Sequence, residues 1–117
     1  MNDCLFCKII KGEIPTKFVY KDEDVAAFKD IHPLAPIHIL IISVKHIPSI
    51  VEVGESDIEL LGKLIVAAKK IAQDMNIAQD GYKLLFRVGK HGGQEVKHIH
   101  LHLIGGAQLS EDIHPVD

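Results

Sequence analysis

The sequence predicts an α+β fold: a five-stranded antiparallel meander sheet with one short N-terminal helix and one long helix. Three observations favour this class. Five apolar runs of strand length are separated by turn residues. Their order along the chain is one helix, three strands, a second helix and two strands. The connections are short, which favours antiparallel neighbours over a doubly wound parallel sheet.

Length and composition indicate one globular domain over residues 1–117, with the short helix in 1–12 and a tail in 107–117. The chain is 47% apolar and 25% charged, which excludes a disordered protein. The net charge of −3 and the lack of a basic cluster argue against binding to a nucleic acid polymer. No apolar run reaches the ~18 residues of a membrane span, and no signal peptide is recognisable. We therefore expect a cytoplasmic protein with reduced thiols and no membrane partner.

The first elements follow from turn and cap residues. A short helix is predicted over Cys4–Ile10, with Asn2 or Asp3 as its cap and Gly12 at its end. Proline-containing loops follow this helix and precede the third strand. Three strands are predicted at residues 18–20, 25–28 and 37–42. The third is a continuous apolar run, so we expect it to be central and buried on both faces.

The long helix begins at Ser56, where Ser56-x-x-Glu59 has the form of a capping box. It carries two apolar stripes, which are Ile58, Leu61, Ile65, Ala68, Ala72 and Met75, and Leu60, Leu64, Ala67 and Ile71. One sheet face usually needs a single stripe, so the second predicts a surface for a partner subunit. Gly62, which costs about 1 kcal/mol relative to alanine, either permits close approach there or is simply tolerated. Two further strands are predicted at residues 82–87 and 96–104.

Three histidines alternate with apolar residues in the last strand. His98, His100 and His102 are two residues apart, so a strand places them on one face. A histidine-rich solvent-exposed face is one interpretation. A metal site is another, because neutral imidazole is a common metal ligand. The third is that one histidine is a nucleophile or base and its neighbours orient the substrate.

A glycine-rich turn comes directly before this strand. Gly92 and Gly93 can adopt positive φ and bring backbone N–H groups close to an anion. An ordinary hairpin turn would look the same in the sequence. The position beside the histidines favours a phosphate cradle that addresses the same ligand.

The two cysteines, Cys4 and Cys7, have the spacing of one half of a zinc site. Two buried thiols are the alternative, and a redox pair is disfavoured because no βαβ pattern surrounds it. Zinc needs two more ligands, for which His46 and His98 are candidates. A closed Cys2His2 site of this kind would be structural rather than catalytic.

The other histidines divide into two kinds. His38 interrupts an apolar run, so it is either a structural core residue or a residue that orients one of the three alternating imidazoles. His32, His91 and His114 lie in turns or in the tail and are expected to be solvated.

The chain resembles the histidine triad superfamily, and within it the Hint branch of small nucleotide-binding proteins. The resemblance extends over nearly all of the chain up to Gly106. The motifs that carry it are Phe6-Cys7-Lys8-Ile9-Ile10, Glu13-Ile14-Pro15, Ala27-Phe28-x-Asp30-Ile31, Ala35-Pro36-x-His38, Gly92-Gly93-Gln94-Glu95-Val96, His98-Ile99-His100-Leu101-His102-Leu103-Ile104 and Gly105-Gly106.

This resemblance implies a homodimer that binds purine nucleotides and hydrolyses nucleoside 5′-phosphoramidates. It implies that His100 attacks the α-phosphorus to form a nucleotidyl-histidine, that His102 contacts the phosphate and assists the leaving amine, and that His38 supports both. It also implies a nucleotide site, with Asp30 on the ribose, an apolar base pocket and a loop along the phosphate. The remaining residues of that site are Phe6, Ile9, Phe28, Ile31, Arg87, Gly93, Gln94, Glu95 and Val96.

The resemblance also implies one structural zinc per chain on Cys4, Cys7, His46 and His98, and no organic cofactor. Two alternatives stay open: a nucleotide-binding module with little catalysis, and a metal-dependent hydrolase in which all three triad histidines bind one ion. The chain departs from the family at Arg87, where asparagine is frequent. It also departs in the tail 107–117, which has no aromatic residue.

Overall fold

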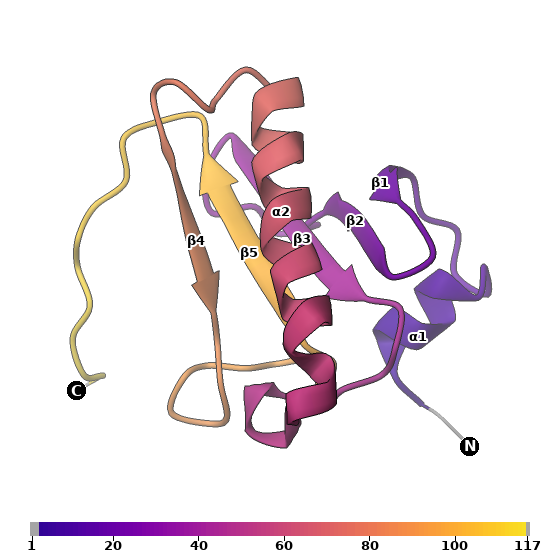
Figure 1. Ribbon diagram of the computed structural model, residues 1–117. Helices are drawn as coiled ribbons and strands as arrows, with labels where there is room; N and C mark the ends of the chain where they lie inside the picture. Colours follow the sequence, from indigo (N-terminus) through magenta and orange to yellow (C-terminus); the bar gives the residue numbers. More distant parts are fainter. Residues whose placement is uncertain (1–2, 117) are drawn as a thin grey trace.

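The computed structural model describes residues 3–116. It contains two α-helices, two short 3-10 turns and five strands, arranged as a sheet with α2 on one face and α1 on the other (Figure 1). Their bounds are α1 Leu5–Ile10, β1 Phe18–Lys21, β2 Val25–Lys29, β3 Ile37–Ser43, η1 Ile50–Glu52, η2 Glu55–Asp57, α2 Ile58–Asp74, β4 Tyr82–Phe86 and β5 His100–Gly105. The predicted class and the five antiparallel strands are confirmed.

The order of strands in the sheet is β1-β2-β3-β5-β4, and every neighbouring pair is antiparallel. The order is therefore sequential only as far as β3, and a complete meander is not formed. Helix α2 follows β3 in the chain, but the next strand, β4, does not pair with β3. Strand β4 lies at the edge of the sheet, and β5 lies between β3 and β4. This arrangement puts the histidine strand β5 next to the central strand β3.

Alternate residues of the sheet build two cores. On the α2 face, Ile39 and Ile41 of β3 and Leu101 and Leu103 of β5 pack against the helix. On the α1 face, a second cluster consists of Phe6, Ile9, Ala26, Phe28, Leu40 and Ile42. His100 and His102 alternate with the leucines of β5, so they lie on the α1 face. The prediction that the third strand is buried on both faces is confirmed, since all its residues except Ile37 are buried.

Helix α1 begins at Leu5, one residue later than predicted, and Cys4 is its N-cap without a side-chain cap hydrogen bond. Asn2 lies outside the described residues. Helix α2 begins at Ile58, and the predicted capping box at Ser56 is not formed, because Ser56 lies in the 3-10 turn η2. Instead, the Asp57 carboxylate accepts a hydrogen bond from the backbone N–H of Gly54 at 3.0 Å.

Burial of α2 does not follow the two predicted apolar stripes, because the residues that pack on the sheet come from both of them. The residues buried against the sheet are Leu64, Ala67, Ala68, Ile71 and Ala72. Ile58, Ile65 and Val66 have exposed fractions of 66%, 49% and 51%. One chain therefore leaves part of the apolar surface of α2 uncovered.

The last predicted strand starts later than expected. The sequence predicts 96–104, but β5 begins at His100, and residues 96–98 form a bend in which the N–H of His98 donates to the carbonyl of Val96 at 2.9 Å. The N–H of Ile99 donates instead to the carbonyl of Ile47, at 2.7 Å. No helix among residues 3–116 is long and apolar enough to cross a membrane.

Candidate functional site

A cavity of about 780 Å³ opens on the α1 face of the sheet, beside β5. Its lining is largely apolar and also includes His100, His102 and Arg87. Seven further residues that the sequence predicts for nucleotide binding also line it, namely Phe6, Ile9, Phe28, Asp30, Gly93, Glu95 and Val96. Ile31 is there too, but it is 86% exposed and so lies at the mouth rather than in a pocket wall.

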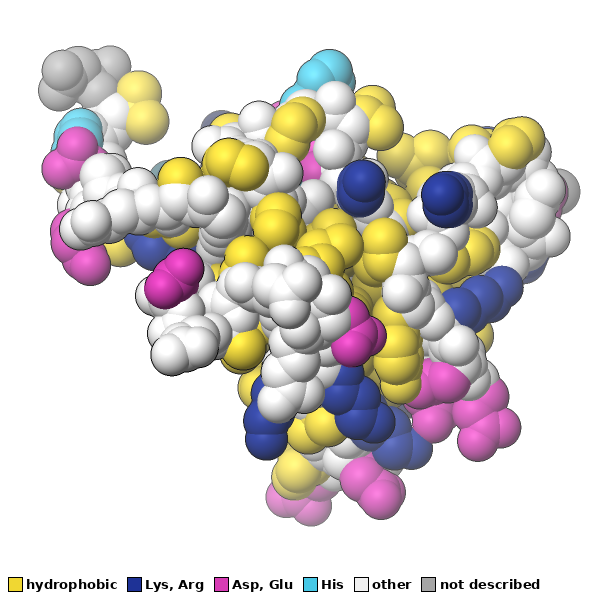
Figure 2. Space-filling model, turned by 90° about the horizontal axis from the view of Figure 1, so that it is seen from above, with side chains coloured by type: hydrophobic (Ala, Val, Ile, Leu, Met, Phe, Trp, Pro, Cys, Tyr) yellow, Lys and Arg dark blue, Asp and Glu magenta, His cyan; other side chains and the backbone are white. Residues whose placement is uncertain are grey.

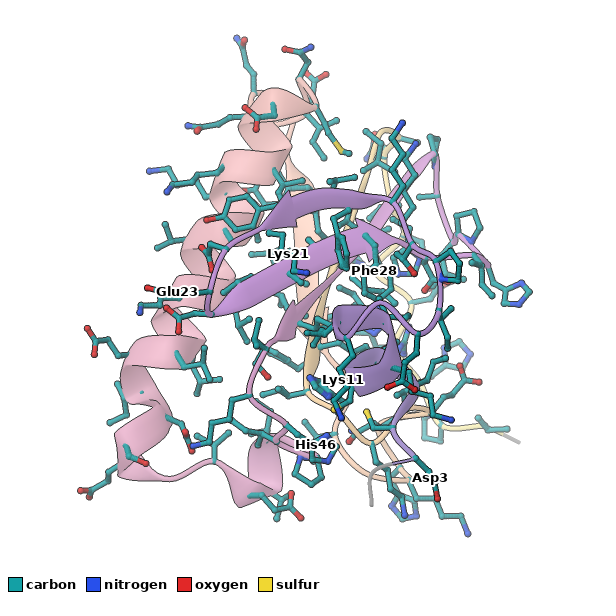
Figure 3. All side chains as sticks on the ribbon, turned by 90° about the vertical axis from the view of Figure 1, so that its right-hand side faces the viewer. Asp3, Lys11, Lys21, Glu23, Phe28 and His46 are labelled. Carbon is teal, nitrogen blue, oxygen red and sulfur yellow. The ribbon has the colours of Figure 1, made fainter. Side chains whose placement is uncertain are left out.

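Aromatic rings form the apolar wall. The ring of Phe6 meets Phe28 edge-on, with centroids 5.5 Å apart, and meets His100 in the same way at 5.1 Å. Figure 3 shows α1 between the strand that carries Phe28 and the loop that carries His46. A flat apolar ligand in this cavity would therefore contact the same ring that packs against His100.

A chain of hydrogen bonds fixes the proton positions on His38 and His102. The backbone N–H of Leu34 donates to Nδ1 of His38 at 3.1 Å, so the neutral His38 ring carries its proton on Nε2. That Nε2–H is 2.9 Å from Nδ1 of His102 and donates to it. His102 must then carry its own proton on Nε2. This atom is buried and has no hydrogen-bond partner among residues 3–116.

His100 has the opposite arrangement. Its Nδ1–H donates to the carbonyl oxygen of His98 at 2.7 Å, which leaves a lone pair on Nε2. The cavity is therefore lined by an imidazole with an available lone pair, His100, and an imidazole with an available N–H, His102. Such a pair matches a nucleophile and a hydrogen-bond donor for one reacting centre.

Burial keeps these rings neutral. Desolvation lowers the pKa of His38 and of His100, and the positive charge of Arg87 lowers both further, while the Asp30 carboxylate opposes this effect. Desolvation, with the neighbouring His100, His38 and Arg87, lowers the pKa of His102 to about 4. At neutral pH a lone pair on the His100 ring is thus available for attack.

Asp30 is held at the edge of the cavity by the loop after β2. One carboxylate oxygen accepts a hydrogen bond from the backbone N–H of His32 at 2.8 Å, and the other lies 3.5 Å from Nε2 of His38. The carboxylate is 19% exposed and lines the cavity next to the aromatic wall. It can accept hydrogen bonds from hydroxyl groups of a ligand.

The glycine-rich turn contributes Gly93 to the lining of the cavity that His100 and His102 also line. Gly93 has a φ of +78°, which side-chain-bearing residues rarely adopt, and a Cβ on Gly92 would lie 2.4 Å from the carbonyl oxygen of Val88. The side chain of Gln94 does not line the cavity. Its amide nitrogen donates to the carbonyls of Pro48, at 2.6 Å, and Val96, at 3.0 Å, so it holds the loop in place.

Arg87 follows β4 on the cavity side of the sheet. Leu85 is opposite His102 in the register, and Arg87 comes two residues later on the same face. Its Nη1 would lie 3.8 Å from a Cβ on Gly93, so the guanidinium passes beneath the glycine turn. The sequence alone does not specify this direction.

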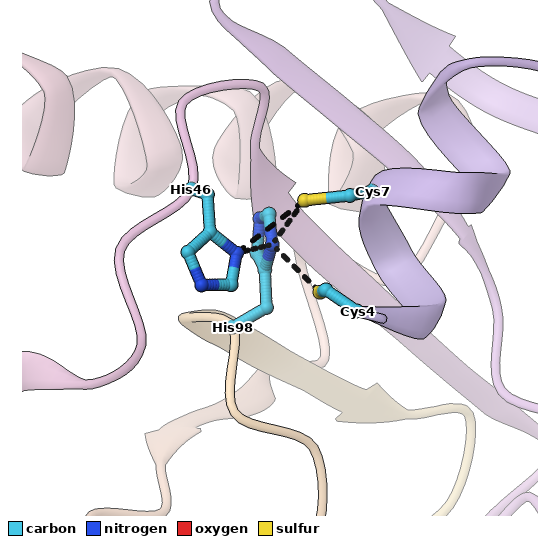
Figure 4. Close-up of side chains that lie close together, drawn as sticks. All are labelled: Cys4, Cys7, His46 and His98. Atoms are coloured by element: carbon cyan, nitrogen blue, oxygen red, sulfur yellow. Dashed lines mark hydrogen bonds between the residues drawn. The ribbon is translucent and has the colours of Figure 1, made fainter. Parts of the chain in front are cut away.

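A second group of side chains meets at the start of α1 (Figure 4). Nδ1 of His98 lies 3.3 Å from Sγ of Cys4, 3.6 Å from Sγ of Cys7 and 3.1 Å from Nδ1 of His46. Sγ of Cys7 is 3.3 Å from Nδ1 of His46. All four donor atoms lie within 4.8 Å of one another.

This donor set fits a tetrahedral zinc ion. Zinc–sulfur and zinc–nitrogen bonds of ordinary length give donor–donor separations of about 3.4–3.8 Å, close to those observed. Nε2–H of His98 donates to the carbonyl of Ser43 at 2.6 Å, which leaves the lone pair on Nδ1 facing both thiols. Desolvation lowers the pKa of His98 to about 4, so it is neutral, as a metal ligand must be.

The three triad histidines do not face a common point, so the hypothesis that they share one ion is not supported. Both nitrogens of His98 are directed at the cysteine cluster and at Ser43. His32, His91 and His114 are exposed, as predicted.

The face drawn in Figure 2 carries acidic and basic side chains interspersed around apolar ones, and neither sign of charge dominates it.

The sequence matches the family model described as scavenger mRNA decapping enzyme C-terminal binding over residues 3–113. It is 50% identical over 108 residues to a purine nucleoside phosphoramidase of Escherichia coli K12, covering 92% of this chain and 91% of that protein. The chain belongs to the histidine triad family. Identity of this kind over almost the whole length of both proteins decides the assignment.

Solved histidine triad structures share the fold. A HIT family hydrolase from Legionella pneumophila Philadelphia 1 has a TM-score of 0.91 and 51% identity, covering 93% of this chain and 97% of that one. A histidine triad protein from Clostridium difficile has a TM-score of 0.93 and 39% identity, covering 97% and 98%. This histidine triad protein is accordingly a hydrolase.

Two backbone groups of the site are not identifiable from side-chain patterns. The carbonyl of His98 orients His100, and the carbonyl of Ser43 orients His98. Neither residue's own side-chain chemistry predicts this role, because any residue presents a carbonyl there. The bend at residues 96–98 precedes Ile99, whose N–H donates to the carbonyl of Ile47, a residue far away in the sequence.

Proposed function

We propose that the protein hydrolyses purine nucleoside 5′-phosphoramidates through a covalent nucleotidyl group on His100. The observation that carries this proposal is the fixed pair of proton positions in the cavity, a lone pair on Nε2 of His100 beside an N–H on Nε2 of His102. The name of the E. coli relative, purine nucleoside phosphoramidase, agrees with the substrate class.

The substrate would lie across the cavity. The purine packs on the wall of Phe6 and Phe28, where a flat apolar surface is already formed. The ribose hydroxyls donate to the Asp30 carboxylate. The phosphorus then lies over the histidines, next to the backbone of the glycine turn at Gly93.

In the first step the lone pair of His100 Nε2 forms a bond to phosphorus and the phosphorus–nitrogen bond of the substrate breaks. The departing nitrogen takes the Nε2 proton of His102, and the negative charge left on that ring is balanced by the positive charge formed on the neighbouring His100 ring. The carbonyl of His98 on Nδ1–H stabilises the positive charge that the His100 ring acquires. In the second step water attacks phosphorus, the bond to His100 breaks, and the water returns a proton to His102. The products are a nucleoside monophosphate and an amine.

We propose that Cys4, Cys7, His46 and His98 hold one zinc ion per chain, which ties α1 to the loop before β5. When bound, the ion supplies a structural cross-link. The donor geometry supports this role, and the separation of the cluster from the cavity leaves the reaction to His100 and His102. Thiolate ligands persist in a reducing compartment, which agrees with a cytoplasmic setting.

We further propose a homodimer formed through the exposed apolar residues Ile58, Ile65 and Val66 of α2 and through the edge strand β4. The apolar residues of α2 that one chain leaves uncovered support this, and β4 has no strand on its outer side among residues 3–116. Ile65→Glu should shift the protein to monomers in sedimentation equilibrium. Ile113→Glu, in the exposed tail, should not. A dimer that survives Ile65→Glu would contradict this interface.

The catalytic proposal is tested with an adenosine 5′-phosphoramidate. The wild-type protein, quenched in alkali during turnover, should carry an added nucleotidyl mass. His100→Ala should lose the adduct and reduce turnover at least 100-fold, as is typical for loss of a nucleophile, while it still binds adenosine monophosphate. Tight binding by the wild-type protein without turnover would instead indicate a nucleotide-binding module, and turnover by His100→Ala at near the wild-type rate would refute the mechanism.

A further inference from the structure

Arg87 is a cation in the cavity without an acidic partner. The ion pairs among residues 3–116 are His38–Asp30, Lys45–Asp57 and Lys63–Asp24, and Arg87 is in none of them. It makes no hydrogen bond with these residues either. A half-buried guanidinium in this position keeps its five N–H donors for a ligand.

The position of Arg87 in the sheet places it on a particular side of the histidines. The aromatic wall stands over β2, the histidines lie on β5, and Arg87 follows β4. The strand order is β2-β3-β5-β4, so the histidines lie between the wall and Arg87. A nucleoside held on the wall with its phosphorus at His100 has Arg87 on the other side of the histidines. The departing nitrogen leaves opposite Nε2 of His100, so a charged group on the amine reaches Arg87 through the flexible chain that carries it.

No carboxylate among residues 3–116 forms an ion pair with Arg87. Glu95 also lines the cavity and is exposed, but no ion pair joins it to Arg87. Asp30 belongs to the wall side, where it lies 3.5 Å from His38. Because Arg87 lines the same cavity as His100 and His102, its charge lowers the pKa of His38, His100 and His102, while the Asp30 carboxylate acts on all three in the opposite direction and Glu95 does so on His100.

We propose that Arg87 is a specificity-determining residue that selects phosphoramidates whose leaving amine bears a carboxylate, as in nucleotidylated amino acids. A planar guanidinium binds a carboxylate through two parallel hydrogen bonds, a geometry that neither asparagine nor lysine reproduces. The proposal rests on the proposed function above and names the leaving group of that reaction.

The test compares two substrates that differ only in charge at the leaving group. One is adenosine 5′-phosphoramidate of β-alanine, and the other is the methyl ester of the same compound. The quantity measured is the ratio of kcat/KM for the acid to kcat/KM for the ester, in wild type, Arg87→Asn, Arg87→Lys and Lys90→Asn. Lys90 lies exposed in the adjoining turn, so its substitution makes the same change of net charge at a nearby place.

We expect Arg87→Asn to lower this ratio roughly tenfold, the value of one partly exposed charge-assisted contact. Arg87→Lys should restore only part of it, and Lys90→Asn should leave it at the wild-type value. An unchanged ratio in Arg87→Asn would overturn the inference. If kcat/KM fell equally for both substrates, the guanidinium would act on the α-phosphoryl group instead. If the wild-type protein turned over neither substrate, the proposed function itself would fail.

Discussion

Replacing His38 by leucine removes the middle of the hydrogen-bond chain that fixes His102. Leucine fills a similar volume, so we expect little cavity cost at this buried position, which is 4% exposed. Two partners are left unpaired, the backbone N–H of Leu34 and the buried Nδ1 of His102. Each such loss costs about 1–3 kcal/mol, and the N–H of Leu34 is only partly buried. The free energy of unfolding should therefore fall by about 2–4 kcal/mol.

Catalysis should suffer separately from stability. Without the donor from His38, the His102 ring is no longer held with its proton on Nε2, so the departing nitrogen loses its proton source. Loss of an orienting partner of this kind typically reduces activity about 10–100-fold. The assay is kcat for an adenosine phosphoramidate below the unfolding temperature, together with urea denaturation of the same preparation.

Two further variants make this test specific. His38→Gln keeps an N–H donor for His102, so it should recover a large part of the loss in kcat. His32→Leu removes an exposed imidazole from the same loop but keeps the backbone N–H that bonds Asp30, so it should behave as wild type. If His38→Leu keeps kcat within twofold of wild type, the assignment of proton positions is wrong.

Three other predictions follow from the site. Cys4→Ser should reduce zinc from about one ion per chain, measured by elemental analysis, and lower the melting temperature, whereas full occupancy would contradict the ligand set. His102 has a pKa of about 4 in the fold and about 6.5 when unfolded. The unfolded chain therefore binds more protons between these values, and the free energy of unfolding should decrease as the pH is lowered through that window, by at most about 1.4 kcal/mol per pH unit. In urea denaturation over this pH range, the free energy of unfolding of His102→Asn should depend less steeply on pH than that of wild type. His114→Asn should show the wild-type pH dependence. Gly92→Ala, whose Cβ would lie 2.4 Å from the carbonyl oxygen of Val88, should displace the glycine turn and lower kcat/KM, and unchanged kinetics would exclude a tight turn.

The sequence predicts most of the fold because its apolar patterns are strong. The run 37–42 and the alternation in 100–104 each specify a strand, and tertiary packing agrees with them. Strand order is not predictable in the same way. Whether β4 or β5 lies beside β3 depends on the position at which the chain leaves α2 and re-enters the sheet. Both strands have apolar residues suited to either position.

For the site, residue identity predicts more than direction. Alternation places His98 on the same face as His100, but the bend at 96–98 turns it toward the cysteines. Gln94 is polar and adjacent to the cavity residues, yet its amide is used by the backbone of Pro48 and Val96. In both cases a long-range hydrogen bond decides the direction of the side chain, and the local sequence does not indicate that bond.

Helix α1 has only six residues, which is too short to persist without tertiary support. It nevertheless contains Cys7, has Cys4 as its N-cap, and contributes Phe6 to the wall of the cavity. Under the proposed function, the affinity for a nucleobase and the supply of zinc are therefore linked quantities. A cell that runs short of the ion would retain the histidines of this protein in place on their strand and lose the surface that brings a substrate to them.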